Sequence, residues 1–295
     1  MTSAVPDPAD HAASVAPAAR DAASASAASG ASAAPVAELI TYFDDATGER
    51  TGLTASELGG WAAATAALLT AECGLTPGDR VAVLLPPHWQ TAAVLLGAWS
   101  AGLEVSFRGW ATAGLPAADD SPSSGGAARG AFTAAGDSLG GAATGPFPAA
   151  GDSLGATFVE ARRVGSWLDD VPAGRHQFVL GLGAAEPPPG GYRDYLSAVR
   201  PHLGAARPST PVGAHDLAAA GVTFGEYEAV ARGAAASQGI TRGDRVLIEA
   251  SRTEQPVLWL LGPLAAGASI VLCADLDRSR LAERVAAERV TKVFA

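Results

Sequence analysis

A ten-residue segment occurs twice in this chain, and the duplication limits the folds that the chain can adopt. The first copy is GLTPGDRVAV at residues 74–83, and the second is GITRGDRVLI at residues 239–248. In both copies a Gly-Asp-Arg turn leads into a short apolar run that is typical of a buried strand. We therefore expect two copies of one folded unit within the chain.

The resemblance between the two copies extends beyond the turn. A capping box opens the helix before each turn, formed by Thr54 with Glu57 in the first copy and by Thr223 with Glu226 in the second. After the turn, each copy continues with a strand, a second helix and a glycine that ends this helix. The interval from Asp79 to Gly102 equals the interval from Asp244 to Gly267.

This order of elements predicts an α/β fold with two similarly wound parallel-sheet lobes and flanking helices. We interpret the Gly-Asp-Arg turns as structural rather than ligand-binding. The glycine is expected to adopt a positive φ, the aspartate to bond the turn backbone, and the arginine to lie over a helix end.

Composition divides the chain into five segments. The first is a disordered tail, because residues 1–36 are almost all Ala, Ser, Pro, Gly and Asp and bury too little apolar surface to order. The first lobe then covers residues 37–111, a low-complexity insertion rich in Gly, Ala and Ser covers 112–156, connecting strands and helices cover 157–216, and the second lobe covers 217–295.

The insertion contains its own short repeat, FTAAGDSLGGA followed by FPAAGDSLGAT. The GDSL letters match an esterase motif, whose serine must sit at a strand-to-helix junction in a folded domain. Ser138 and Ser153 lie instead in low-complexity sequence. We interpret the repeat as a duplication within an insertion and assign no catalytic residue to it.

Charge and hydropathy exclude two kinds of partner. The formal net charge is −10, whereas nucleic-acid-binding surfaces concentrate positive charge. No segment approaches the ~20 uninterrupted apolar residues of a membrane span, and the start of the chain lacks the pattern of a signal peptide. We expect a cytoplasmic protein that binds neither nucleic acid nor membrane.

Cysteine and histidine give no metal site. Cys73 and Cys273 lie in apolar surroundings far apart in sequence, which favours two buried, reduced thiols over a disulfide. His202 and His215 are too isolated in the sequence to indicate a set of metal ligands.

The strongest candidates for a ligand site follow the central strand of each copy, because α/β proteins bind ligands at the carboxyl ends of their strands. They are His88, Trp89 and Gln90 in the first copy and Ser251 and Arg252 in the second. The alternative is that Trp89 packs between the lobes, His88 and Gln90 cap a helix, and the second group is a solvated loop. We likewise interpret Tyr192, Asp194 and Tyr195 as packing residues.

Two longer stretches resemble the N-terminal region of the adenylate-forming superfamily of acyl-CoA synthetases, luciferases and peptide-synthetase adenylation domains. They are LTASELGGWAAATAALL…GLTPGDRVAVLLPPHW…LLGAWSAGLEV and PLAAGASIVLCADLDRSRLAERVAAERVTKVFA. The resemblance covers residues 38–112 and 157–295, and the layout is similar to that of a group of short actinobacterial proteins. It implies two lobes related by a pseudo-twofold axis, with helices sandwiching both sheets.

The sequence departs from the superfamily where the chemistry lies. At the place of the phosphate-binding loop it has RPSTPVGAHDL, which keeps the hydroxyls of Ser209 and Thr210 but has neither a glycine-rich turn nor a lysine. Lys292 is the only lysine, and Ala295 precedes the family's ribose-binding aspartate and its lid with the catalytic lysine. ATP or AMP binding is thus left open.

These departures favour a truncated, non-catalytic member, a pseudoenzyme that binds a small molecule or a partner. The first alternative is a partial AMP-dependent ligase, an acid–AMP ligase completed by a second polypeptide. The second is a purely structural assembly lobe. In each case faces left uncovered by truncation are expected to bind a protein partner or a second copy.

Overall fold

The structure is a computed structural model of the chain, and it describes residues 37–108, 153–166, 171–182, 187–206, 208 and 212–295. The expected N-terminal tail and most of the expected insertion, with Ser138, lie outside these residues. Ser209 and Thr210 also lie outside them. Strand structure resumes at Leu154, within the stretch that the sequence assigns to the insertion.

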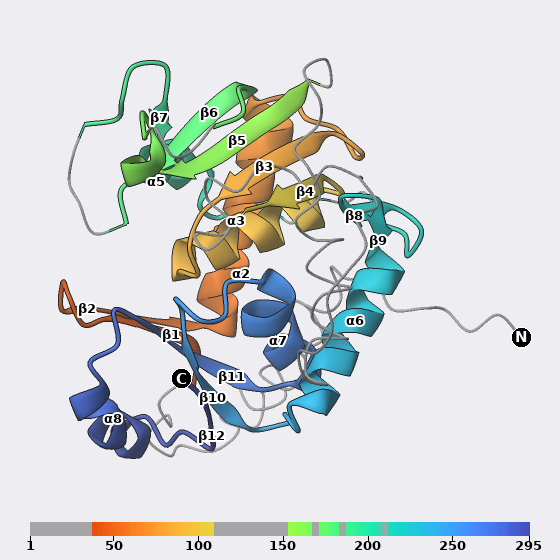
Figure 1. Cartoon of the computed structure of the whole chain (residues 1–295). Helices are drawn as coiled ribbons and strands as arrows, with labels where there is room; N and C mark the ends of the chain where they lie inside the picture. Colours follow the sequence, from red (N-terminus) through yellow and green to blue (C-terminus); the bar gives the residue numbers. More distant parts are fainter. Residues whose placement is uncertain (1–36, 109–152, 167–170, 183–186, 207, 209–211) are drawn as a thin grey trace, which may run out of the picture.

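The first copy of the repeat forms the centre of a seven-stranded sheet with the order β7-β6-β5-β3-β4-β8-β9 (Figure 1). All neighbours in this sheet are parallel except the hairpin of β8 and β9. Its strands are β3 (Arg80–Leu84), β4 (Glu104–Phe107), β5 (Leu154–Glu160), β6 (Gly174–Leu180), β7 (Arg193–Asp194), β8 (Leu217–Ala219) and β9 (Val222–Thr223).

The second copy forms the centre of a five-stranded sheet with the order β12-β10-β11-β1-β2. Here too the neighbours are parallel, except for the hairpin of β1 and β2 at one edge. The strands of this sheet are β1 (Glu38–Asp44), β2 (Glu49–Thr54), β10 (Arg245–Glu249), β11 (Ser269–Ala274) and β12 (Lys292–Phe294).

The two sheets share one topology, because β5-β3-β4-β8-β9 matches β12-β10-β11-β1-β2 strand for strand. The prediction of two similarly wound lobes is therefore confirmed, with antiparallel hairpins added at the edges. Each hairpin lies in the sheet of the other copy. The hairpin β1–β2 precedes the helix of the first copy but pairs with β11 of the second. The hairpin β8–β9 precedes the helix of the second copy but pairs with β4 of the first. Residues 38–54 thus complete the sheet of the second copy.

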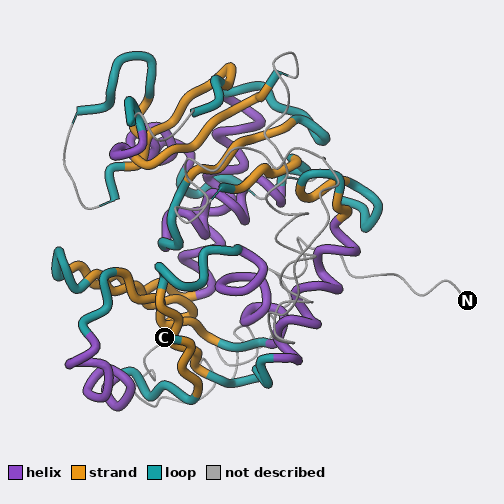
Figure 2. Tube along the Cα trace, in the orientation of Figure 1, coloured by secondary structure: helices purple, strands orange, loops and turns teal. Residues whose placement is uncertain are grey.

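Helices fill the space between the sheets, and one helix covers the outer face of the five-stranded sheet. Figure 1 places α2, α3 and α7 between the two sheets and α8 on the far side of the five-stranded sheet, and Figure 2 shows the same layers. The helices are α2 (Ala55–Ala67), α3 (Trp89–Ser100), α5 (Tyr195–Val199), α6 (Phe224–Ser237), α7 (Gly262–Ala266) and α8 (Leu281–Ala287). The π-helical turns are η1 (Leu68–Glu72) and η5 (Val257–Leu261), and the 3₁₀ turns are η3 (Ala161–Arg163), η4 (Arg200–His202) and η6 (Arg278–Arg280).

The apolar core is continuous between the lobes. One cluster joins residues of both sheets to the helices between them, among them Ile40, Val81, Trp89, Ile248 and Trp259. A smaller cluster lies on the outer face of each sheet; the one on the five-stranded sheet is covered by α8. None of the described helices is long and apolar enough to cross a membrane.

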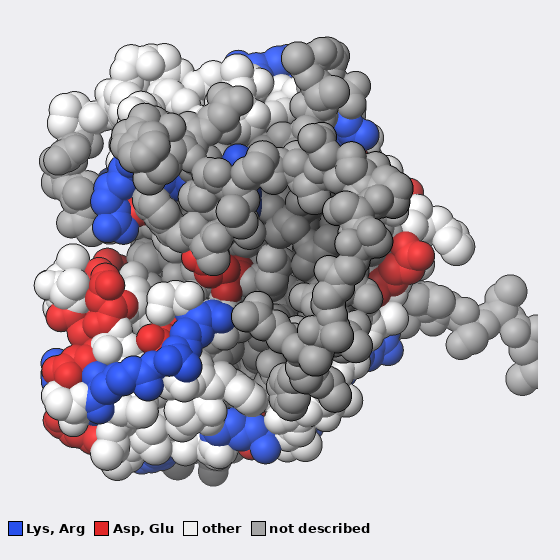
Figure 3. All heavy atoms as spheres, viewed as in Figure 1, with Lys and Arg blue, Asp and Glu red and all other residues white. Residues whose placement is uncertain are grey.

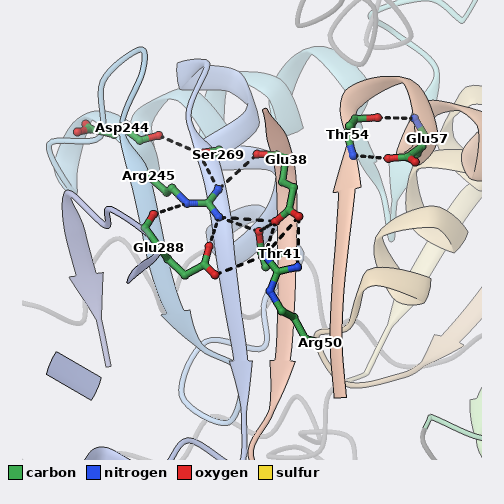
Figure 4. A network of polar contacts seen from close by, with 9 residues as sticks. All are labelled: Glu38, Thr41, Arg50, Thr54, Glu57, Asp244, Arg245, Ser269 and Glu288. Atoms are coloured by element: carbon green, nitrogen blue, oxygen red, sulfur yellow. Dashed lines mark hydrogen bonds and ion pairs between the residues drawn. The ribbon is translucent and has the colours of Figure 1, made fainter. Parts of the chain in front are cut away.

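Both expected capping boxes are present. The Thr54 hydroxyl accepts a hydrogen bond from the Glu57 backbone N–H at 3.2 Å, and the Glu57 carboxylate accepts one from the Thr54 N–H at 2.8 Å (Figure 4). Thr223 and Glu226 repeat this exchange at the start of α6. Two unsatisfied N–H groups are thereby satisfied at the start of each helix.

The Gly-Asp-Arg turns also have the expected backbone. Gly78 and Gly243 adopt φ of 88° and 85°, which a side chain would strain. Each turn aspartate accepts from the backbone N–H three residues before it, Asp79 at 2.7 Å and Asp244 at 2.7 Å. The turn chemistry predicted from the sequence is confirmed for these residues.

The two turn arginines differ from each other. Arg245 donates to the Glu288 carbonyl at 2.7 Å, at the C-terminus of α8, so it lies over a helix end as expected. Arg80 pairs with the Glu104 carboxylate at 2.9 Å on the adjacent strand. The reason is the residue paired with each arginine in the ladder, which is Glu104 beside Arg80 but Ser269 beside Arg245.

Candidate functional site

The first candidate group lies where β3 ends and α3 begins. Pro86 and Pro87 end the strand, and His88 is the N-cap residue of α3. Its Nδ1 accepts a hydrogen bond from the Gln90 backbone N–H at 3.1 Å. Because an accepting Nδ1 carries no proton, the neutral ring holds its proton on Nε2.

The His88 ring is enclosed by the hairpin β1–β2, which belongs to the sheet of the second copy. It is 1% exposed and meets the edge of the Tyr42 ring of β1, with centroids 4.2 Å apart. Its Nε2 lies 3.9 Å from Oε1 of Glu49 on β2, too far for a hydrogen bond, and has no partner among the described residues. The side chain therefore joins the lobes, with one buried donor left unsatisfied.

Glu49 is the polar centre of this group. Its Oε1 accepts from the Trp89 indole at 3.2 Å and from the Thr51 hydroxyl at 3.0 Å. Trp89 in turn packs edge-on against Trp61 of α2, with ring centroids 5.5 Å apart. The expectation that Trp89 packs between the lobes and that His88 caps a helix matches these contacts.

Burial and charge act in opposite directions on His88. Burial lowers the pKa of this imidazole, and the carboxylates of Glu49, Asp44 and Glu160 oppose the change without reversing it. The His88 ring and the hydrogen bonds from Thr51 and Trp89 lower the pKa of Glu49, and its own burial opposes them. We take His88 as neutral and Glu49 as ionised near pH 7.

The second candidate group lies where β10 ends. The Ser251 hydroxyl donates to Oε1 of Glu249 at 3.3 Å, and Arg252 Nε lies 3.2 Å from Oε2 of the same carboxylate. A third donor comes from η6, because Arg278 Nη2 also reaches Glu249 Oε2, at 2.6 Å. One carboxylate therefore holds three side chains that come from two separate loops.

The two groups are not joined to each other by any hydrogen bond or ion pair found among the described residues. Sequence reasoning identified His88, Trp89, Gln90, Ser251 and Arg252 but missed the residues that hold them, Tyr42, Glu49, Glu249 and Arg278. Glu249 had a signal, since it directly follows the apolar run of the second copy and is the last residue of β10. Tyr42, Glu49 and Arg278 had none, because they come from elements distant in sequence.

A further pair of buried polar atoms follows the second group. Gln255 Oε1 and Trp259 Nε1 are buried without a hydrogen-bond partner in the described part of the chain. Trp259 belongs to the π-helical turn η5, a type of irregularity that is frequent near functional sites. The interval in sequence from Asp244 to Gln255 equals that from Asp79 to Gln90, so the two glutamines are counterparts in the repeat.

The single lysine lies at the other end of the second sheet. Lys292 pairs in the β-ladder with Val246, near the start of β10, whereas Glu249 is at its end. Its ammonium group lies against Gly239, since a side-chain carbon added there would be 3.8 Å from Lys292 Nζ. The lysine is thus on the side of the Gly-Asp-Arg turn, away from the candidate groups.

The remaining polar residues singled out in the sequence have structural contacts. The Tyr195 hydroxyl is buried and 2.8 Å from the Thr65 hydroxyl, and Asp194 caps α5 by accepting from the Ser197 N–H at 2.8 Å. His202 contacts the Glu72 carboxylate at 2.8 Å. No group of three or more His, Cys, Asp or Glu side chains suited to a metal occurs among the described residues.

Both cysteines are buried free thiols. Burial raises the pKa of each, Cys73 to about 11 and Cys273 to about 11, so neither is a reactive thiolate near neutral pH.

Comparison with known sequences finds one family model that matches part of the chain and one relative that matches most of it. A model of the AMP-binding enzyme family matches residues 29–112. A Mycobacterium tuberculosis (strain ATCC 25618 / H37Rv) protein described as a TIGR03089 family protein is 36% identical over 262 residues, which is 88% of this chain and 92% of the relative.

Solved structures show the same fold. The N-terminal domain of FACL13 from Mycobacterium tuberculosis matches with a TM-score of 0.58 at 15% identity, over 95% of this chain and 62% of that one. Acetoacetyl-CoA synthetase from Streptomyces lividans matches with a TM-score of 0.60 at 19% identity, over 97% of this chain and 42% of that one. The chain thus spans less than two thirds of each of these solved proteins.

Proposed function

Because the chain belongs to the TIGR03089 family and has the fold of the N-terminal domains of acyl-CoA synthetases, we propose that it binds a ligand without activating acids by itself. The ligand would lie at the carboxyl ends of β3 and β10, where the two candidate groups are. In this proposal the two-lobed scaffold of an adenylate-forming enzyme serves binding rather than turnover.

The position of Lys292 carries the proposal. Attack of a carboxylate on the α-phosphate of ATP needs compact positive charge beside the departing pyrophosphate, and loss of one such preorganised contact costs about 3 kcal/mol of transition-state stabilisation. The one lysine of the chain lies near Gly239 and Val246, away from the carboxyl end of β10. An arginine is a poor substitute for a compact ammonium charge.

The test of turnover is release of pyrophosphate from ATP by the purified chain, with a panel of carboxylic acids. We expect no release above that of a protein-free control, with an active acyl-CoA synthetase as the positive control. Release that depends on both ATP and an acid would overturn the proposal.

The test of binding is thermal unfolding with ATP, AMP, CoA and acyl adenylates. A ligand present at about 100 times its Kd adds ~2.7 kcal/mol to the free energy of unfolding, which shifts the midpoint measurably. At least one of these compounds is expected to do so. Absence of a shift with the whole panel would favour a purely structural assembly lobe.

A second candidate is a partial ligase that a separate polypeptide completes. The fold that the chain shares with acetoacetyl-CoA synthetase from Streptomyces lividans supports this candidate. Pyrophosphate release that appears only after a second polypeptide is added, and depends on both chains, would support this candidate over the first.

We also propose a cytoplasmic setting. Both cysteines are free thiols, which fits a reducing compartment. Fractionation of cells that produce the full chain tests this point, with the protein expected beside cytoplasmic markers.

A further inference from the structure

The carboxylate of Glu249 holds two arginines at the end of β10. Its Oε2 accepts a hydrogen bond from Arg278 at 2.6 Å and lies 3.2 Å from Arg252 Nε in an ion pair, and its Oε1 accepts a hydrogen bond from Ser251 at 3.3 Å. We call these four residues the Glu249 clamp. Because both guanidinium groups meet one oxygen atom, a single small anion can contact both of them.

The arginines of the clamp keep donors available to solvent. Their side chains are 61% and 52% exposed, whereas Glu249 is 13% exposed and lies on the inner side. Each guanidinium has five N–H donors, and its contact with Glu249 uses only a minority of them. Two positive charges over one negative charge leave the clamp with a local excess of positive charge.

Both arginines are attached to ordered backbone. Arg252 follows a turn in which its N–H donates to the Glu249 carbonyl at 3.2 Å. Arg278 begins η6, and Asp277 fixes the start of this turn. The Asp277 N–H donates to the Asp45 carboxylate at 2.8 Å, and the Asp277 carboxylate accepts from the Ser279 N–H at 2.9 Å. Asp45 is itself paired with the buried Arg284. The clamp is therefore preorganised, which lowers the entropic cost of binding.

The surroundings make this concentration of basic groups unusual for the chain. The chain carries a formal net charge of −10. Figure 3 nevertheless shows a band of Lys and Arg side chains across one face of the five-stranded lobe, beside acidic side chains. An anion is repelled by the chain as a whole, so its binding requires local donors such as these.

We infer that the Glu249 clamp is a binding site for a phosphate group. A phosphate presents several charged oxygen atoms in different directions, so it can accept from both guanidinium groups at once. A carboxylate offers two oxygens in one plane and fits fewer of these donors. The inference rests on the proposed ligand-binding function and gives its ligand a phosphate group.

Calorimetric titration of the full chain with inorganic phosphate and with AMP in low-salt buffer tests the inference, with acetate as the carboxylate control. We expect the wild-type chain to bind phosphate or AMP and to bind acetate more weakly. Arg252→Gln and Arg278→Gln should each weaken binding about tenfold or more, since each removes charge-assisted hydrogen bonds. Equal affinity for the two probes indicates free phosphate, and tighter binding of AMP indicates a phosphate ester.

The matched control is Arg232→Gln, which makes the same change of charge on α6, where Arg232 pairs with Glu228. It should leave phosphate affinity unchanged. A circular dichroism melt of each variant identifies any loss of folding. Failure of the wild-type chain to bind either probe would overturn the inference, as would equal weakening by Arg232→Gln and Arg278→Gln.

The phosphate titrations and the tests of the proposed function can fail independently of each other. If CoA or an acyl adenylate stabilises the chain and both variants equally while phosphate and AMP do not bind, ligand binding stands and the clamp assignment fails. If the chain releases pyrophosphate on its own, the proposed function fails, and the phosphate titrations still decide the clamp.

Discussion

Arg245 of the second Gly-Asp-Arg turn donates a hydrogen bond from Nη2 to the Thr41 hydroxyl at 2.8 Å, although 204 residues separate them (Figure 4). The bond ties the exchanged hairpin β1–β2 to the sheet that it completes. A counterpart exists in the other sheet, where the Gly221 N–H donates to Glu104 at 3.2 Å. Each copy of the repeat therefore holds a hairpin that belongs in sequence to the other copy.

The first prediction concerns Arg245 itself. Its guanidinium contacts the carboxylate and the carbonyl of Glu288 as well as Thr41, and its side chain is 17% exposed. Arg245→Gln should lower the free energy of unfolding by about 2–3 kcal/mol, because it leaves a partly buried carboxylate with only the longer contact to Arg50 and removes the hydrogen bond to Thr41. Urea unfolding followed by circular dichroism measures the change.

Arg50→Gln is the control for this prediction. Arg50 pairs with Glu38 and Glu288 in the same network, but its side chain is 48% exposed. Such a pair contributes about 1 kcal/mol or less. Equal losses from the two substitutions would mean that the network acts through overall charge and that Arg245 is not its centre.

The second prediction concerns the contact between α2 and α3. A side-chain carbon added at Gly97 would lie 2.6 Å from Thr65 Cβ and 2.8 Å from the Ala62 carbonyl oxygen. Gly97→Ala should therefore destabilise the chain by about 1–3 kcal/mol through overpacking, despite the better helix propensity of alanine. Thermal or urea unfolding gives the value.

Gly60→Ala, on α2, separates sterics from propensity. A carbon added there meets nothing within 4 Å. This variant should be more stable than the wild-type chain by about 0.5–1 kcal/mol, the usual gain from replacing glycine within a helix. A Gly97→Ala variant as stable as Gly60→Ala would refute the close approach of the two helices.

The third prediction is a pH dependence that originates at His88. Burial lowers the pKa of this imidazole in the folded chain, while an unfolded histidine titrates near 6.5. Below that pH the unfolded state binds the extra proton, so stability is lost as pH falls, by up to ~1.4 kcal/mol per pH unit for one group. Tyr42 also faces the ring, and the carboxylates of Glu49, Asp44 and Glu160 oppose this effect only in part.

His88→Asn tests this effect, because asparagine is a good N-cap residue but does not titrate. Between pH 7 and pH 5 the variant should lose less stability than the wild-type chain, as measured by urea unfolding at each pH. His215→Asn changes an exposed histidine and should retain the wild-type slope. A His88→Asn variant with the wild-type slope would show that His88 is not the titrating group.

Local features of the fold could be predicted from the sequence because their signals lie within a few residues. The capping boxes at Thr54 and Thr223 and the glycines of the two turns are examples. The different roles of Arg80 and Arg245 also had a signal, since the ladder neighbour is an acid in one copy and a serine in the other.

The exchange of hairpins could not be predicted in this way. Elements adjacent in sequence usually pack together, so the sequence predicts that residues 38–54 belong to the first lobe, with the helix that follows them. The candidate groups were found at strand ends, but Glu49 and Arg278 enter them from distant segments. Spacing along one copy contains no information about such partners.

The most direct test of the interlocked architecture is native-state hydrogen exchange of the backbone amides in low concentrations of denaturant. Because each sheet includes a hairpin from the other copy, opening one sheet disrupts both. The slowest amides of β3 (Arg80–Leu84) and of β10 (Arg245–Glu249) should therefore exchange with the same opening free energy and the same denaturant dependence. Exchange of one strand through an opening of clearly lower free energy, while the other stays protected, would contradict the interlock.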